Sequence, residues 1–158
     1  MTTQDSITGR THIRNDIIAI LIAGAIAETV FEIIAWLVTP ALFGFALQPA
    51  FLIDALSTIY LGLPLGYPTA FGLHVLAGIV LFPLGYRLMI SILPIKPAWI
   101  TGTIWGVILW FLAQGILAPL AGRLFMMDWS AFTWASLIGH VIYGLALGVA
   151  YKSVLSRL

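Results

Sequence analysis

The chain has 158 residues, of which 61% are hydrophobic and only 8% are charged, and its mean hydropathy is +1.08. Seven basic and six acidic side chains are too few to cover the surface of a soluble domain of this size. The net charge of +1, without a run of Lys or Arg, excludes a nucleic-acid-binding surface, and the lack of cysteine excludes disulfides and thiolate metal ligands. We therefore predict an integral membrane protein whose main solvent is the lipid bilayer.

Four apolar segments are long enough to cross the hydrocarbon core of a bilayer, which takes about 20 residues of α-helix. The first segment follows a polar stretch and has 22 residues, too many for a cleaved signal sequence, so we expect it to be retained as a helix. The predicted spanning helices cover residues 17–38, 69–93, 99–118 and 132–151. They predict an all-α membrane protein in which residues 1–158 form a single four-helix transmembrane domain.

Prolines divide these segments, because proline lacks a backbone N–H and collides with the preceding turn of a helix. Pro83 lies inside the second segment and is expected to kink it. Pro49 and Gly62 flank an apolar stretch, residues 49–60, that we predict to be a short interfacial helix on the outer membrane surface. The other prolines fall at segment edges, where we expect helices to start or stop: Pro40, Pro68, Pro94, Pro97 and Pro119.

Basic residues predict the orientation, since Lys and Arg stay mainly on the cytoplasmic side of short connections. Only Arg123 falls in a connection on the opposite side of the membrane. The other six basic residues fall on one side: Arg10, Arg14, Arg87, Lys96, Lys152 and Arg157. We therefore predict that the N and C termini are both cytoplasmic, in a multi-pass protein of a cell inner (cytoplasmic) membrane.

The two halves of the chain show an internal repeat. His74 and Gly78 in the second segment recur as His140 and Gly144 in the fourth, and each histidine is followed by Val. Because each half crosses the membrane twice, the halves would form two parallel hairpin repeats. His74 and His140 should then lie at the same depth in the membrane.

Five polar side chains are expected near the middle of the bilayer, counted from the segment ends at about 1.5 Å of helix rise per residue. Ionisable groups at this depth cost several kcal/mol unless they pair or reach water, so they should face the helix bundle or a partner protein. Two of them are one turn apart on the first segment. This intramembrane polar layer, our candidate site, consists of Glu28, Glu32, His74, Gln114 and His140.

Four interpretations of the polar layer are open from the sequence. Its members can bond to one another and hold the helices in register. His74 and His140, on parallel helices, can bind a b-type haem through neutral imidazoles. Glu28, Glu32 and the histidines can relay protons or cations. A non-haem metal site ranks last, because both Glu residues share one helix and no Glu-x-x-His spacing occurs.

The last segment carries the pattern Gly139-His140-x-x-Tyr143-Gly144-x-x-x-Gly148. With the earlier histidine segment, it resembles a family of small, functionally uncharacterised four-span membrane proteins of bacteria and archaea that end in a Gly-His-x-x-Tyr-Gly helix. Members of that family are sometimes associated with haem–copper oxidase systems, so the resemblance implies association with a respiratory or other redox complex. The acidic pair of the first segment is not part of the pattern.

The sequence contains no nucleophile elbow, phosphate-binding loop or zinc-protease helix. We therefore predict a non-catalytic accessory subunit of a larger membrane redox or respiratory complex, with lipid and that complex as its partners. One alternative is a bis-histidine b-haem electron-transfer protein that uses His74 and His140. Another is a proton or ion conduit through the polar layer.

Overall fold

The computed structural model describes the backbone of residues 3–93 and 97–158 and, within these ranges, the side chains from residue 13 onward. The described part of the chain is helical and contains no strand. Its helices include four that are long and apolar enough to span a membrane: Ile13–Phe43, Tyr67–Ile92, Ala98–Leu120 and Ala131–Leu155. The predicted all-α architecture with four spanning helices is confirmed.

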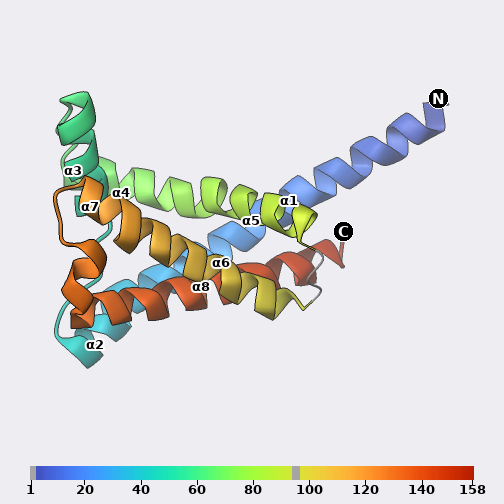
Figure 1. The fold of residues 1–158 in the computed structure, drawn as a ribbon. Coiled ribbons are helices and arrows are strands. Elements are labelled where there is room, and N and C mark those ends of the chain that lie inside the picture. The colour runs from blue at the N-terminus through green and yellow to red at the C-terminus, as the bar shows by residue number, and fades with distance from the viewer. Residues whose placement is uncertain (1–2, 94–96) are drawn as a thin grey trace.

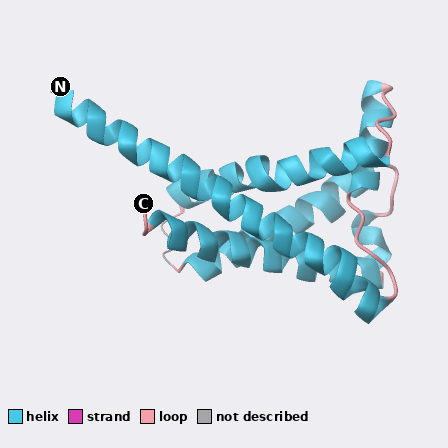
Figure 2. Cartoon of the chain, turned by 180° about the vertical axis from the view of Figure 1, so that it is seen from behind, coloured by secondary structure: helices cyan, strands magenta, loops and turns pink. Residues whose placement is uncertain are grey.

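Each of the first three spans consists of two α-helices joined by a π-helical turn, whereas the fourth is one continuous helix. The first span contains α1 (Thr3–Ile33), η1 (Ile34–Val38) and α2 (Thr39–Phe43). The second span contains α4 (Tyr67–Leu76), η2 (Ala77–Leu81) and α5 (Phe82–Ile92), and the third contains α6 (Ala98–Phe111), η3 (Leu112–Leu117) and α7 (Ala118–Leu120). The fourth span is α8 (Ala131–Leu155). The connections add α3 (Ala50–Leu61) and the 3-10 turn η4 (Phe125–Trp129). Both termini lie at the same end of the bundle (Figures 1 and 2).

Several predicted boundaries can be compared with these helices. Helix α1 begins well before the predicted position 17, and its polar first part projects beyond the other helices (Figure 1). Helix α3 falls where the short helix 49–60 is predicted, and its place at a membrane surface stays a prediction. The cytoplasmic orientation and the repeat also stay predictions. Of the residues used for them and for helix ends, Lys96 and Pro94 lie outside the described residues, as does the side chain of Arg10.

The expectation that helices end at Pro40 and Pro119 is wrong. The helices continue past both prolines to Phe43 and Leu120. Each of these prolines, like Pro83 in the second span, is the second residue after a π-helical turn. A proline cannot donate to the carbonyl four residues before it and collides with that carbonyl, and the wider π turn relieves the collision. The spans therefore absorb their prolines without ending.

A π turn before a proline leaves one carbonyl without its helical donor. In the second span the N–H of Phe82 bonds to the carbonyl of Ala77, so the next donor in the series would be Pro83, which has no N–H. The carbonyl of Gly78 instead accepts a 2.6 Å hydrogen bond from the hydroxyl of Tyr143 on α8. This bond ties the middle of the second span to the middle of the fourth.

Small residues allow the helices to approach closely on the terminal side of this level. Ala19, Ala23 and Ala27 on α1 have no exposed surface. A Cβ atom added at Gly144 on α8 would collide with the backbone carbonyl of Gly102 on α6, so these two helices touch through their backbones. Contacts between small residues are a common way to join membrane helices, because lipid supplies no hydrophobic force between them.

Polar groups at the terminal end of the bundle are paired. Arg87 Nε donates a 2.7 Å hydrogen bond to Asp16, and the hydroxyl of Tyr151 also donates to Asp16. Tyr86 and Thr101 share a hydrogen bond of 2.9 Å between their hydroxyls. These contacts join α1, α5, α6 and α8 at one level of the bundle.

Helix α3 lies at the opposite end of the bundle from the termini (Figure 1). The Asp54 carboxylate accepts a 2.9 Å hydrogen bond from the backbone N–H of Gly66, at the start of α4. The hydroxyl of Tyr60 donates to the carbonyl of Leu120 at 3.2 Å, at the end of α7. Helix α3 is thereby fastened to the ends of two spans.

Candidate functional site

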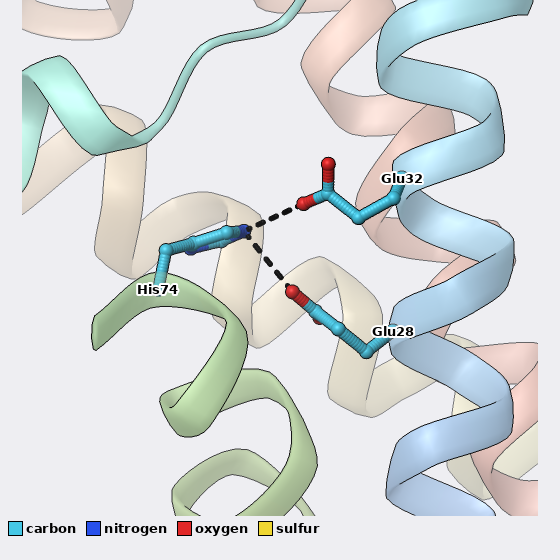
Figure 3. A group of neighbouring side chains, drawn as sticks. All are labelled: Glu28, Glu32 and His74. Atoms are coloured by element: carbon cyan, nitrogen blue, oxygen red, sulfur yellow. Dashed lines mark ion pairs between the residues drawn. The ribbon is translucent and has the colours of Figure 1, made fainter. Parts of the chain in front are cut away.

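Three members of the polar layer meet in the middle of the bundle. His74 Nε2 lies 3.5 Å from Glu28 Oε1 and 3.8 Å from Glu32 Oε1 (Figure 3). One ligand atom from each of the three residues lies within 4.8 Å of the others. The two carboxylates come from α1 and the imidazole from α4. We call Glu28, Glu32 and His74 the Glu–Glu–His cluster.

The atoms that face one another in this cluster have no hydrogen-bond partner. Glu28 Oε1, Glu32 Oε1 and His74 Nε2 are all buried and unpaired. Glu28 is only 4% exposed and His74 only 8%. Their separations exceed the usual 2.7–3.2 Å of an N–H···O bond, so the cluster does not have the bonds that would hold the helices in register. Burial without pairing costs stability, which points to a role other than structural support.

Local structure directs the two carboxylates toward His74. Glu28 and Glu32 are one helical turn apart and therefore lie on the same face of α1. The carboxylate of Glu28 occupies the space beside Gly78, where an added Cβ atom would collide with it. Glu32 accepts a 2.8 Å hydrogen bond on Oε2 from Trp36 Nε1, which leaves Oε1 free to face His74. The geometry of the site thus depends on the lack of a side chain at Gly78 and on the hydrogen bond from the Trp36 indole.

The remaining members of the polar layer form a second group. His140 Nδ1 lies 2.7 Å from the carbonyl oxygen of Ser136, and Gln114 Nε2 donates to the Ser136 hydroxyl at 3.2 Å. Phe31 packs against both histidines, with ring-centroid distances of 5.6 Å to His74 and 5.5 Å to His140. The structure therefore brings all five predicted residues near one another, but in two groups that share contact with Phe31.

Two hollows reach the Glu–Glu–His cluster. A cavity of about 120 Å³ is lined by both histidines and Gln114 and extends toward Arg123 and α3, at the end opposite the termini. A wider groove of about 440 Å³ on the outside of the bundle is lined by Glu28 and Glu32, together with residues of η1, α4 and η2. The imidazole of the cluster therefore lines the cavity, and the two carboxylates line the groove.

The residues do not fit a haem held by both histidines. Phe31, which is 4% exposed, lies against both imidazole rings, so a porphyrin between them would require this buried side chain to leave. The arrangement favours protons or an ion over a porphyrin.

The electrostatics of the Glu–Glu–His cluster require positive charge. Among the described residues, neither carboxylate forms an ion pair with Lys or Arg, and the only neighbour able to carry a positive charge is His74. Two ionised carboxylates at this depth would be costly. The cluster is therefore built to hold either protons or a cation.

Some residues that shape the site were missed at the sequence level. Phe31 and Tyr143 could not be assigned from sequence, because their roles depend on contacts between helices. Trp36 follows Glu32 by four residues, a spacing that places the two side chains on one helix face, so this contact could have been found. Tyr143 belongs to the pattern of the last helix, and its bond to Gly78 explains why a tyrosine stands there.

A protein-family model described as a family of unknown function, DUF6789, matches residues 14–157. Neither a curated protein nor a solved structure matches the chain. The match covers the first span from residue 14, the other three spans completely, and every residue of the polar layer.

Proposed function

Since this chain belongs to DUF6789, a family whose function is unknown, we propose from its geometry that it is a non-catalytic membrane subunit that takes up and holds protons inside the bilayer. The single observation behind this proposal is the convergence of three buried, unpaired atoms of Glu28, Glu32 and His74. Carboxylates and imidazoles that face one another in a membrane are the groups that proton-translocating proteins use. A proton on any of the three would neutralise part of the charge and join two of them.

The cavity supplies a route for protons from one side. Its lining includes Gln48, Arg123, Gln114, Ser136 and both histidines, enough polar groups to hold a short chain of water molecules. Helix α3 and the segment before it lie at its outer end. Protons would reach His74 from the end of the bundle opposite the termini.

Within the part of the chain that the structure describes, the route does not continue to the terminal end. Between the cluster and that end lie fully buried small residues, such as Ala19 and Ala23, packed against α8. The other opening is the groove beside Glu28 and Glu32, which faces sideways into the membrane. A site that is open sideways suits transfer to a second membrane protein better than conduction by one chain.

This sideways opening supports the accessory role predicted from the sequence. Trp36 and Leu37 line the groove and are 39% and 67% exposed, so a partner helix could bury them. The resemblance to proteins associated with haem–copper oxidase systems makes a respiratory complex of a prokaryotic cytoplasmic membrane the expected partner. Electron transfer through a haem is not part of the proposal.

Infrared difference spectra of the full-length protein in lipid, recorded between buffers of pH about 6 and about 10, test the proton-holding role, because exposed carboxyl groups, with a pKa of about 4, stay ionised over this range. We expect a band change from the protonated carboxyl groups of Glu28 and Glu32 that weakens in Glu28→Gln or Glu32→Gln and is lost in the double variant. Asp128→Asn, which changes an exposed carboxylate in η4, is the matched control and should leave the band unchanged. An unaltered band in the double variant would overturn the proposal.

Extraction of native membranes with a mild detergent tests the accessory role separately. The tagged chain should bring down larger membrane proteins at constant stoichiometry, and Glu28→Gln should not abolish the association. Recovery of the chain alone, at several detergent strengths, would contradict the accessory role and leave the proton-holding role to the infrared test.

A further inference from the structure

Two separations within the Glu–Glu–His cluster are close to those expected between ligands of one metal ion, and its three ligand atoms all lie within 4.8 Å of one another. In tetrahedral coordination with bonds of about 2.0–2.2 Å, two ligand atoms lie about 3.4 Å apart. His74 Nε2 is 3.5 Å and 3.8 Å from the two carboxylate oxygens, too long for good hydrogen bonds but close to this value. The same three atoms are buried and unpaired, so nothing in the described chain competes for them.

We propose that Glu28, Glu32 and His74 form an intramembrane binding site for a divalent transition-metal ion of the zinc, manganese or ferrous-iron class. This proposal goes beyond proton holding, and metal and protons would compete for the same atoms. Two carboxylates and one neutral imidazole compensate a divalent charge, and among the described residues neither carboxylate has a Lys or Arg partner. The donor set contains no thiolate or thioether, so it does not favour Cu(I).

Surrounding groups orient the ligands, as is usual around protein metal sites. Trp36 Nε1 holds Glu32 Oε2 at 2.8 Å and leaves Oε1 for the ion. Phe31 packs against the His74 ring, and Gly78 leaves space for the Glu28 carboxylate. Three protein ligands leave at least one coordination position for water.

The open side of the metal site is the groove. Of the described residues that line it, only Glu28 and Glu32 are charged, so the groove attracts cations. The cavity on the other side of His74 is lined by Arg123, whose positive charge opposes the entry of a metal ion. Metal exchange is therefore expected from the side of the groove that Glu28 and Glu32 line.

Metal titration of the full-length protein in nanodiscs, after removal of bound metal by a chelator, tests the site. Zn²⁺ should bind at one ion per chain, and Co²⁺ should give ligand-field absorption bands. Glu28→Gln, Glu32→Gln and His74→Ala should each weaken Zn²⁺ binding by more than about 100-fold, and Trp36→Phe by about 10- to 100-fold. Mg²⁺ should not compete, because it prefers six oxygen ligands.

Matched controls separate the site from the fold. Asp128→Asn changes an exposed carboxylate and Lys152→Ala an exposed basic residue, and both variants should bind Zn²⁺ as the unaltered protein does. All variants should keep the helical circular-dichroism spectrum and the elution volume of the unaltered protein. Absence of Zn²⁺ binding in the unaltered protein, or unchanged binding in the three ligand variants, would overturn the metal site.

The metal and proton proposals fail in different ways. Metal binding requires deprotonated ligands and therefore releases protons. If the infrared carboxyl band responds to pH but Zn²⁺ does not bind, only the metal site falls. If Zn²⁺ binds to the three residues but no carboxyl band responds to pH, only the proton-holding role falls.

Discussion

Two carboxylates on the same helix have different surroundings in this protein. Asp16, near the terminal end of the bundle, accepts hydrogen bonds from Arg87 and Tyr151. Glu28, about three turns further along α1, is more deeply buried and has an oxygen without any partner. An unpaired buried polar group costs about 1–3 kcal/mol. The comparison identifies Asp16 as a group that holds helices together and Glu28 as one that is available for a ligand.

The packing around the two carboxylates differs in the same way. On the terminal side α6 and α8 touch through their backbones, because a Cβ atom added at Gly148 would collide with the carbonyl of Ala98. At the level of Glu28, π turns, Gly78 and a cavity loosen the bundle. Turns of π-helix inside longer helices are frequently found at functional sites. Substitutions should therefore affect stability on the terminal side and ligand binding in the middle.

The largest loss of stability is expected from Gly144→Ala. The new Cβ would collide with the backbone of Gly102 and Gly106, which cannot move away as a flexible side chain could, so α6 and α8 must separate. We expect the free energy of unfolding, measured by SDS titration in mixed micelles, to fall by about 3 kcal/mol. Gly72→Ala is the matched control, since its Cβ meets no neighbouring atom, and should change stability by less than about 0.5 kcal/mol. Equal effects at the two glycines would show that close backbone packing does not decide stability here.

Removal of the cation beside Asp16 should have the next largest effect. Arg87→Ala leaves the Asp16 carboxylate without its 2.7 Å donor, although the pair is partly exposed, with side-chain exposures of 38% and 25%. We therefore expect a loss of about 1–2 kcal/mol in the same unfolding measurement, less than for a fully buried pair. Lys152→Ala removes an exposed basic residue and should be nearly neutral. A neutral Arg87→Ala would mean that the two carboxylates are not as different as their contacts suggest.

The fold could be predicted largely from hydropathy, because a spanning helix needs a long apolar run that few other structures share. The continuation of the helices past Pro40 and Pro119 could not be predicted in this way. Whether a helix passes through a proline depends on whether another group satisfies the freed carbonyl, and in a membrane neighbouring helices provide such groups. Tyr143, which bonds to the Gly78 carbonyl, is 65 residues away in sequence. No local pattern around Pro83 indicates that donor.

The candidate site could be predicted in composition but not in arrangement. Depth in the membrane follows from counting residues, and it identified Glu28, Glu32 and His74. The direction in which each side chain points around its helix axis depends on how the helices pack. The division of the polar layer into two groups was therefore not predictable. The metal interpretation ranked last because both Glu residues share one helix. Their one-turn spacing instead allows both to reach the same imidazole.

A methyl group at Gly78 should disturb the site more than the fold. The Cβ of Gly78→Ala would overlap the carboxylate of Glu28, which lies at the end of a flexible side chain and can turn away. We expect a stability loss of about 1 kcal/mol but a loss of Zn²⁺ affinity of at least about tenfold, because the carboxylate leaves His74. Gly72→Ala again serves as the control in both measurements. If the loss of Zn²⁺ affinity is no larger than the loss of stability in both variants, the space at Gly78 has no specific role in metal binding.

Glu28→Gln is expected to change stability least. Unlike the substitutions above, it should leave stability the same or raise it. The substitution keeps the shape of the side chain and removes a charge that has no Lys or Arg partner and faces a second carboxylate, Glu32. Because no hydrogen bond of Oε1 is lost, the free energy of unfolding should stay the same or rise by up to about 1 kcal/mol, measured without metal. Asp16→Asn is the informative counterpart, since it weakens the contacts with Arg87 and Tyr151 and should lower stability. If both substitutions destabilise the protein equally, Glu28 has a structural partner in the membrane, and the distinction between a holding carboxylate and an available one does not stand.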